Sequence, residues 1–116
     1  MELSSRIVNN VLIIDVIGEI DIYNSSNIKE LIMKKVDDGE NKIIINLARV
    51  NYIDSSGIGT FISCNSLLAK YKGALIIENV NDSIQKIFRL TQLDSILYIA
   101  KNEEEALNFF KNRFNK

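Results

Sequence analysis

The chain has 116 residues, of which 47% are hydrophobic and 25% are charged, and its formal net charge at pH 7 is -1. These values are typical of one globular domain and argue against a disordered chain. A charge so close to neutral also argues against a nucleic-acid partner, because such binders carry clustered Lys and Arg.

The sequence contains no His and a single cysteine, Cys64. The usual general base, a thiolate-rich zinc site and an intrachain disulfide are therefore excluded. No hydrophobic run approaches the roughly 18 residues of a membrane helix, and the start at Met1 lacks the features of a signal peptide. We expect a cytoplasmic protein of one domain, residues 1–116, with no metal, cofactor or membrane partner.

Hydrophobic runs rich in β-branched residues alternate with segments of helical periodicity, which predicts strands and helices in turn. The elements expected in chain order are strands at Leu3–Val8 and Val11–Ile17, a helix at Asn24–Val36, a strand at Lys42–Leu47, a helix at Gly57–Lys70, a strand at Ala74–Ile77, a helix at Asp82–Leu90, a strand at Ile96–Ala100 and a helix at Glu103–Phe114.

Polar residues at three helix starts are the expected caps, namely Asn24 or Ser25, Asp82 and Asn102. Residues at helical spacing are expected to face the core. They are Ile28, Leu31, Ile32, Val36, Ile58, Phe61, Ile62, Leu68, Ala69, Ile84, Ile87, Phe88, Ala106, Leu107, Phe110 and Phe114. Cys64 lies outside this pattern, and we expect it to be a small packing residue with no redox role.

The alternation predicts an α/β fold with a mostly parallel central sheet of about five strands, an antiparallel N-terminal edge hairpin and about four helices. Loops that leave the carboxyl ends of parallel strands gather at one edge, where ligands usually bind. Two such loops carry polar residues, Gly18–Asp21 and Asp54–Gly57. We therefore expect these loops to be neighbours in space.

The segment "IDSSGIG" allows several functions. A nucleophilic serine needs a base, and without His only Asp54 or a lysine is available. The segment is neither a G-x-S-x-G elbow nor an S-x-x-K motif. Gly57 and Gly59 at a helix start could expose amides to a phosphate, but the P-loop pattern is absent.

Two further interpretations stay open. Asp, Ser and Gly are the residues that helix capping requires. Alternatively, an exposed serine at a helix start is accessible to a kinase, and its phosphate would add about -1.5 to -2 charges. The helix end tolerates that anion, whereas a partner that had to bury it would not. Such a serine would be a binding switch.

Three motifs resemble the STAS domain family, and within it the bacterial anti-sigma-factor antagonists. They are "GEIDIYNSSNIKELI" from Gly18, "NLARVNYIDSSGIGTFI" from Asn46 and "IQKIFRLTQLDSILYIAKNEEEAL" from Ile84. The resemblance covers nearly the whole chain, and the three motifs occur in order without large insertions.

The resemblance implies a STAS fold and a partner-switching protein with no enzymatic activity. The unphosphorylated form would bind an anti-sigma factor that is also a serine kinase. This binding would release the sigma factor. Phosphorylation of Ser55 would block binding, and a serine phosphatase would reverse it. Ser56 would be the helix cap and at most a secondary phosphosite. The protein would be a monomer or a weak dimer.

The resemblance also implies a partner-binding set of Asp21, Asp54, Ser55, Ser56, Gly57 and Gly59. Asp54 would bind loop amides and orient the kinase, and Asp21 would belong to the partner interface or cap the first helix. The two glycines would allow close approach of the partner, or close packing of the helix on the sheet. A STAS scaffold without a switch and a small nucleotide-binding protein remain alternatives.

Overall fold

The computed structural model describes residues 1–114. Its elements in chain order are β1 (Glu2–Val8), β2 (Val11–Ile20), α1 (Ser25–Asp37), β3 (Lys42–Ile53), α2 (Ser55–Ala69), β4 (Ala74–Glu78), α3 (Asp82–Leu90), a 3-10 helix η1 (Leu93–Ser95), β5 (Tyr98–Ala100) and α4 (Glu103–Phe114). Within these residues, no helix is long and apolar enough to span a membrane.

The strands form one sheet in the order β1-β2-β3-β4-β5. β1 pairs antiparallel with β2, and the remaining pairs are parallel. The two strands of the hairpin are joined by Asn9 and Asn10, which both have positive φ, as a tight hairpin turn requires. The predicted α/β class, with a mostly parallel sheet and an antiparallel edge hairpin, is confirmed.

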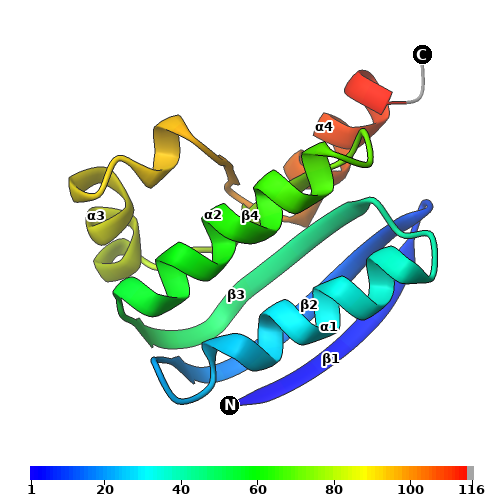
Figure 1. Cartoon of the computed structure of the whole chain (residues 1–116). Coiled ribbons are helices and arrows are strands. Elements are labelled where there is room, and N and C mark those ends of the chain that lie inside the picture. The colour runs from blue at the N-terminus through cyan, green and yellow to red at the C-terminus, as the bar shows by residue number, and fades with distance from the viewer. Residues whose placement is uncertain (115–116) are drawn as a thin grey trace.

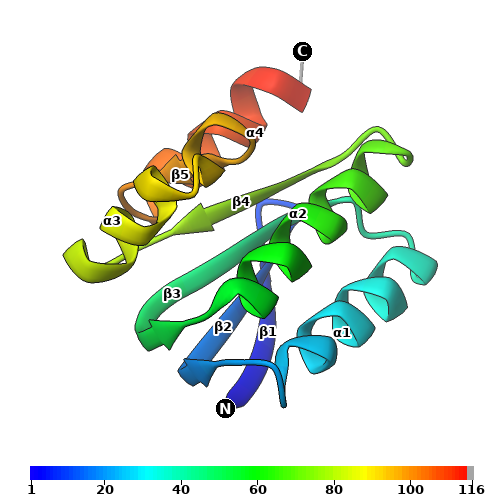
Figure 2. The same cartoon turned by 60° about the vertical axis from the view of Figure 1, so that its left-hand side comes forward.

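The helices cover the sheet unequally. α1 and α2 lie side by side on one face, and α4 lies on the other (Figures 1 and 2). Because successive strand residues point to opposite faces, Leu12 and Ile14 enter the larger core under α1, α2 and α3. Val11 and Ile13 enter the smaller core, which Ala106 and Phe110 of α4 complete. Both faces of the central strands are therefore dry, which explains their nearly continuous hydrophobic runs.

β2 and β3 are longer than predicted. They continue to Ile20 and Ile53, which pair with each other at the end of the ladder. Two register shifts interrupt this pairing, and Gly18 beside the second has a φ of +108°. Periodicity could not predict this extension, because bulges break the alternation of inward and outward side chains. Most of the predicted Gly18–Asp21 loop is thus strand.

The C-terminal strand is shorter than predicted. β5 begins at Tyr98 rather than Ile96, and η1 precedes it where no helix was expected. Gln92, at the N-cap of η1, has a left-handed φ of 60°. In this turn the amide of Ser95 donates to the carbonyl of Gln92, and the amide of Ile96 donates to the carbonyl of Leu93. Extended backbone therefore begins two residues later than the β-branched pattern suggests.

Several predicted caps and core positions were wrong. Asn81 rather than Asp82 caps α3, with its Oδ1 2.9 Å from the amide of Ile84. Ala69 is exposed at the end of α2. Cys64 is fully buried within the larger core, so its packing role is confirmed although the stripe drawn for α2 excluded it. α2 packs against both β4 and α1, which broadens its buried face.

The other helix faces follow the prediction. Asn102 caps α4 by accepting from the amide of Glu105 at 2.9 Å. Leu31, Ile62, Ile87 and Leu107 are partly buried against the two cores. The side chain of Phe114 lies outside the described residues. The remaining predicted core residues are buried: Ile28, Ile32, Val36, Ile58, Phe61, Leu68, Ile84, Phe88, Ala106 and Phe110.

Candidate functional site

The two polar loops meet at the carboxyl edge of the sheet, as expected from the topology. The amide of Asp54 donates to the carbonyl of Ile20 at 3.2 Å. In return, the amide of Ile22 donates to Oδ2 of Asp54, also at 3.2 Å. The backbone amide and the carboxylate of Asp54 thus join the loop after β3 to the loop after β2.

Asp54 is the N-cap of α2, a role that had been assigned to Ser56. Its backbone is extended, with φ of -106° and ψ of -176°, and its Oδ1 accepts from the amides of Ser56 and Gly57 at 3.0 and 3.3 Å. The hydroxyl of Ser56 donates to the same oxygen at 2.5 Å. α2 therefore begins at Ser55, two residues earlier than predicted. The predicted role of Asp54 in binding loop amides is confirmed.

These donors determine the charge of Asp54. The hydroxyl of Ser56, and then the amides of Gly57, Ser56 and Ile22, lower the pKa of the carboxyl below its ordinary value. The helix N-terminus favours the anion in the same direction. Asp54 is therefore a permanent negative charge beside the serines at neutral pH.

The two serines have different environments. Ser55 is exposed at the first position of α2, and its hydroxyl makes no hydrogen bond among the described residues. The hydroxyl of Ser56 is half-buried and bound to Asp54. A kinase would reach the Ser55 hydroxyl directly, whereas at Ser56 it would first have to break the bond to Asp54. The hydroxyl of Ser55 is therefore the more accessible of the two.

The two glycines differ as clearly. Gly57 is buried, and a Cβ added there would lie 2.7 Å from side-chain atoms of both Ile20 and Ile53. Its role is therefore close packing of α2 on the sheet. Gly59 is exposed, and an added Cβ would meet no atom within 4 Å. Of the two alternatives that the sequence left open, packing applies to Gly57, and an open surface for a partner is available at Gly59.

The loop after β2 is tied down by its own side chains. Asp21 accepts from the amide of Tyr23 at 2.9 Å. Asn24 accepts from the amide of Asp21 and donates to the carbonyl of Glu19, both at 2.9 Å. Asn24 occupies the N-cap position of α1 but makes no side-chain cap bond. Neither Asp21 nor Asn24 is thus a helix cap, and both serve to shape the loop.

This loop presents two large apolar side chains to solvent. Ile22 is 70% exposed and Tyr23 is 90% exposed. The sequence motifs predicted no role for either residue. The available signal was their position, because two large apolar residues follow an acidic residue just before a helix start, where packing does not require them. Tyr52 on the neighbouring strand is also exposed.

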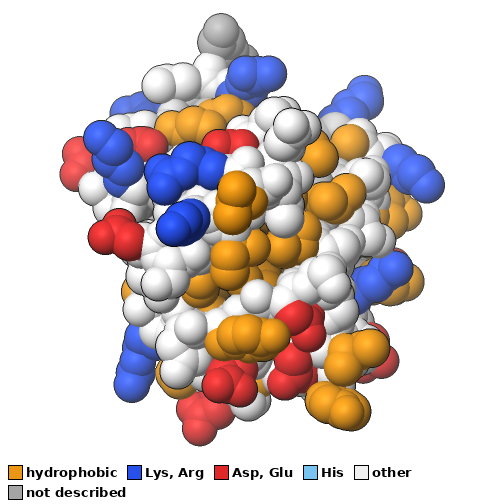
Figure 3. Space-filling view, turned by 90° about the vertical axis from the view of Figure 1, so that its left-hand side faces the viewer, with side chains coloured by type: hydrophobic (Ala, Val, Ile, Leu, Met, Phe, Trp, Pro, Cys, Tyr) orange, Lys and Arg blue, Asp and Glu red, His pale blue; other side chains and the backbone are white. Residues whose placement is uncertain are grey.

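Figure 3 looks onto the side of the molecule that carries these loops and α3. Hydrophobic side chains gather at its centre, and acidic side chains lie among further hydrophobic ones in its lower half. The exposed large apolar residues of these elements are Ile22, Tyr23, Tyr52 and Leu90. An apolar surface with an acidic border is suited to contact with another protein.

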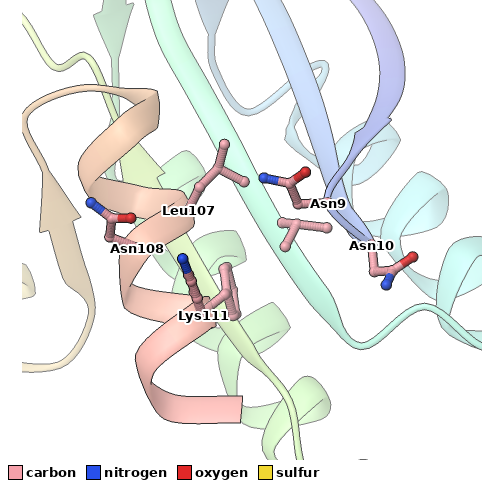
Figure 4. A pocket seen from close by; sticks show the side chains of 7 residues that line it. Asn9, Asn10, Leu107, Asn108 and Lys111 are labelled. Atoms are coloured by element: carbon pink, nitrogen blue, oxygen red, sulfur yellow. The ribbon is translucent and has the colours of Figure 1, made fainter. Parts of the chain in front are cut away.

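A groove lies at the opposite end of the sheet, away from the serine loop. In Figure 4, Asn9 of the hairpin turn lies opposite Leu107 of α4, and Asn10, Asn108 and Lys111 also line the groove. The groove has a volume of about 490 Å³ and contains none of the predicted site residues. Among the described residues, no group of three His, Cys, Asp or Glu side chains is placed to hold a metal ion.

Comparison with known proteins places this geometry in context. The STAS domain family matches residues 2–106. The chain is 31% identical over 87 residues to the anti-sigma-B factor antagonist of Staphylococcus aureus, covering 75% of this chain and 81% of that protein.

Solved structures agree with this match. A crystal structure of a Thermotoga maritima protein superposes with a TM-score of 0.87 at 26% identity, covering 92% of each chain. The phosphorylated form of the Bacillus cell fate determinant SpoIIAA superposes with a TM-score of 0.71 at 25% identity, covering 93% of this chain and 98% of that one. The family expected from the three sequence motifs is confirmed: this chain belongs to the STAS domain family.

Proposed function

We propose that this protein is a cytoplasmic anti-sigma-factor antagonist that acts as a single STAS domain and is switched by phosphorylation of Ser55. In its unphosphorylated form it binds an anti-sigma factor with serine kinase activity, and the sigma factor is released. The observation that carries the proposal is the exposed, unpartnered Ser55 hydroxyl, which lies on the same sheet edge as exposed apolar side chains. The anti-sigma-factor antagonists among the relatives support the same role.

The electrostatics of the loop explain why a phosphate would act on binding rather than on folding. A phosphoserine carries about -1.5 to -2 charges, and at an exposed helix N-terminus the anion is favoured by about 0.3–1 kcal/mol. Asp54 lies next to Ser55 and stays ionised, so the new charge adds to an existing one. A partner surface that buried both anions without matching cations would lose far more than the helix end gains.

The residues divide into three roles under this proposal. Ser55 is the phosphoacceptor, and Asp54 holds the loop and orients the kinase. Asp21 and Gly59 lie on the partner-facing surface. Gly57 allows α2 to pack closely on the sheet, and Ser56 donates to Asp54 at the start of α2. Ser56 is at most a secondary phosphosite. The protein itself performs no chemistry, since a kinase adds the phosphate and a serine phosphatase removes it.

The test is incubation of the protein with ATP and candidate anti-sigma kinases, followed by intact-mass and phosphopeptide analysis. We expect one added phosphate on Ser55. Ser55→Ala should take up none, and the matched variant Ser56→Ala should still take up one. Ser55→Ala should also bind the kinase and resist inactivation by ATP. If no such kinase adds a phosphate, the protein is a STAS scaffold and its serines serve only α2.

A further inference from the structure

Glu78 is the last residue of β4, and its side chain is completely buried. It points toward α4, because Ile76, two residues earlier, belongs to the core under that helix. Its exposed fraction is 0%, which is rare for a carboxyl group that has no cation bound to it. The sequence motifs and the proposed function assign it no role.

Among the described residues, one of the two carboxyl oxygens of Glu78 has a hydrogen-bond donor and the other has none. Its Oε2 accepts from the amide group of Asn79 at 3.1 Å. Its Oε1 has no donor partner among the described residues. The nearest guanidinium, that of Arg6, donates instead to Asp15 at 2.8 and 3.1 Å and to Glu103 at 3.2 and 2.5 Å. The cation of this region is thus already shared by two other carboxylates.

The groups that face Glu78 make its ionisation unfavourable. β1 contributes the cation of Arg6, β2 contributes Asp15, and α4 contributes Glu103, whose negative charge raises the pKa of Glu78. β3 contributes the neutral Asn46, which is bound to Asp15 and Asn79. An ionised Glu78 would place three carboxylates around one guanidinium. A proton on Oε1 turns that oxygen into a donor toward Glu103. The proton therefore removes both the excess negative charge and the lack of a hydrogen-bond partner at Oε1.

We propose that Glu78 is a proton-binding site that ties α4 to the sheet: its protonated carboxyl donates to Glu103, and loss of the proton weakens the attachment of α4. The acidic cluster is Asp15, Glu78 and Glu103, and Glu78 brings to it a fully buried oxygen that has no donor among the described residues. Neither the Ser55 loop nor any partner protein takes part, so this inference is independent of the proposed function.

The expected titration range follows from the surroundings. Burial, and then the charge of Glu103, raise the pKa of Glu78 from an ordinary value of 4.5 to about 7. The folded protein therefore holds this proton between about pH 4.5 and 7, while the unfolded chain releases it. The resulting stabilisation is complete below about pH 4.5, declines as the pH rises, and is lost above about pH 7.

The direct test is a carbon-detected NMR titration of the side-chain carboxyl carbons in the intact wild-type protein between pH 3.5 and 9. We expect the Glu78 carboxyl carbon to titrate with a midpoint near 7. A Glu78 midpoint near 4.5 would overturn the proposal, because the buried group would then be ionised at neutral pH. This measurement needs no variant and so does not depend on whether a variant folds.

Glu78→Gln tests the consequence for α4, because the glutamine amide is a permanent donor of nearly the same shape. Its melting temperature should equal that of wild type near pH 4.5. The difference in favour of the variant should grow up to about pH 7 and stay constant above it. At pH 8 the α4 amides of Glu78→Gln should exchange hydrogen more slowly than those of wild type at the same pH. Glu104→Gln, on the exposed side of α4, should show neither effect. A constant difference at every pH would contradict the proposal.

Discussion

Two acidic side chains at the carboxyl ends of strands, Asp54 and Glu78, have pKa values shifted in opposite directions. Asp54 is partly exposed but accepts from three backbone amides and one hydroxyl, which lowers its pKa. Glu78 is fully buried with one donor, which raises its pKa to about 7. The difference lies in the supply of donors. A helix N-terminus offers free amides, whereas a strand end inside a sheet has already used its own.

The comparison also distinguishes two regions by whether they tolerate a change of charge. The serine loop, residues 54–59, has an outer side that faces solvent at Ser55 and Gly59 and can accept a change of charge. The cluster of Arg6, Asp15, Glu78 and Glu103 beneath α4 has one cation for its carboxyl groups and cannot accept a further negative charge. The following experiments test that contrast, from the largest expected effect on stability to the smallest.

The inner side of the serine loop should be the least tolerant position. Gly57→Ala places a methyl group 2.7 Å from side-chain atoms of Ile20 and Ile53. We expect unfolding in urea to show a loss of about 1–3 kcal/mol, the usual cost of overpacking. The matched variant Gly59→Ala should gain up to about 1 kcal/mol, because it relieves a helical glycine in open space. Equal effects at both positions would remove the distinction between the two sides of the loop.

Removal of the cation should disturb the cluster beneath α4. Arg6→Met leaves Asp15 and Glu103 without their charged donor. Because the Arg6 side chain is 40% exposed, solvent screens the pair, and we expect a loss of about 1–2 kcal/mol in urea unfolding. Arg89→Met, an exposed arginine on α3, is the control and should change stability by less than about 0.5 kcal/mol. A similar loss for both variants would mean that the cluster has no special balance.

Removal of the Asp54 side chain tests the donor-rich site. Asp54→Ala loses the N-cap of α2 and the link to Ile22. We expect a loss of about 1 kcal/mol by urea unfolding, within the range of about 0.5–2 kcal/mol for N-cap residues. Asp82→Ala should cost only a few tenths of this, because Asn81 is the cap of α3. If Asp82→Ala proved as damaging, the corrected cap assignment would be wrong.

The contribution of Asp54 to stability should depend on pH in the opposite direction to that of Glu78. Because the folded-state pKa of Asp54 is lowered, its contribution is present above about pH 4 and is lost as the pH falls through the folded value. The melting-temperature advantage of wild type over Asp54→Asn should therefore be complete at pH 6 and fade as the pH falls below about 4. An advantage that persisted in acid would show that the charge of Asp54 is unimportant.

The outer side of the loop should tolerate charge almost without cost to the fold. Ser55→Asp adds a carboxylate at the exposed first position of α2, where the helix end favours an anion. We expect a change in unfolding free energy within about 0.5 kcal/mol and a clear fall in affinity for the anti-sigma kinase by calorimetry. The fall should be partial, since one carboxylate carries less charge than a phosphate. A loss of stability comparable to that of Gly57→Ala would make Ser55 a structural residue and defeat the switch.

Much of the fold followed from local patterns. The order of strands and helices, the antiparallel hairpin at Asn9 and Asn10, and the meeting of the two loops were predicted, because periodicity and parallel topology constrain them. The motif around Asp54 and Ser55 indicated the family and the phosphoacceptor. The cap role of Asp54 was assigned to Ser56, since both residues are good caps and the choice depends on the backbone angles where β3 ends.

By itself, the sequence determined the family, the alternation of elements and the identity of the candidate switch, since each is written in short stretches of residues. The tertiary structure decided how far β2 and β3 extend, that Gly57 packs inward while Gly59 stays open, and that Ser55 rather than Ser56 has a free hydroxyl. It also decided the state of Glu78. That residue ends a hydrophobic run, and only the placement of α4 and Arg6 withholds from it the water and the cation that an ordinary glutamate has.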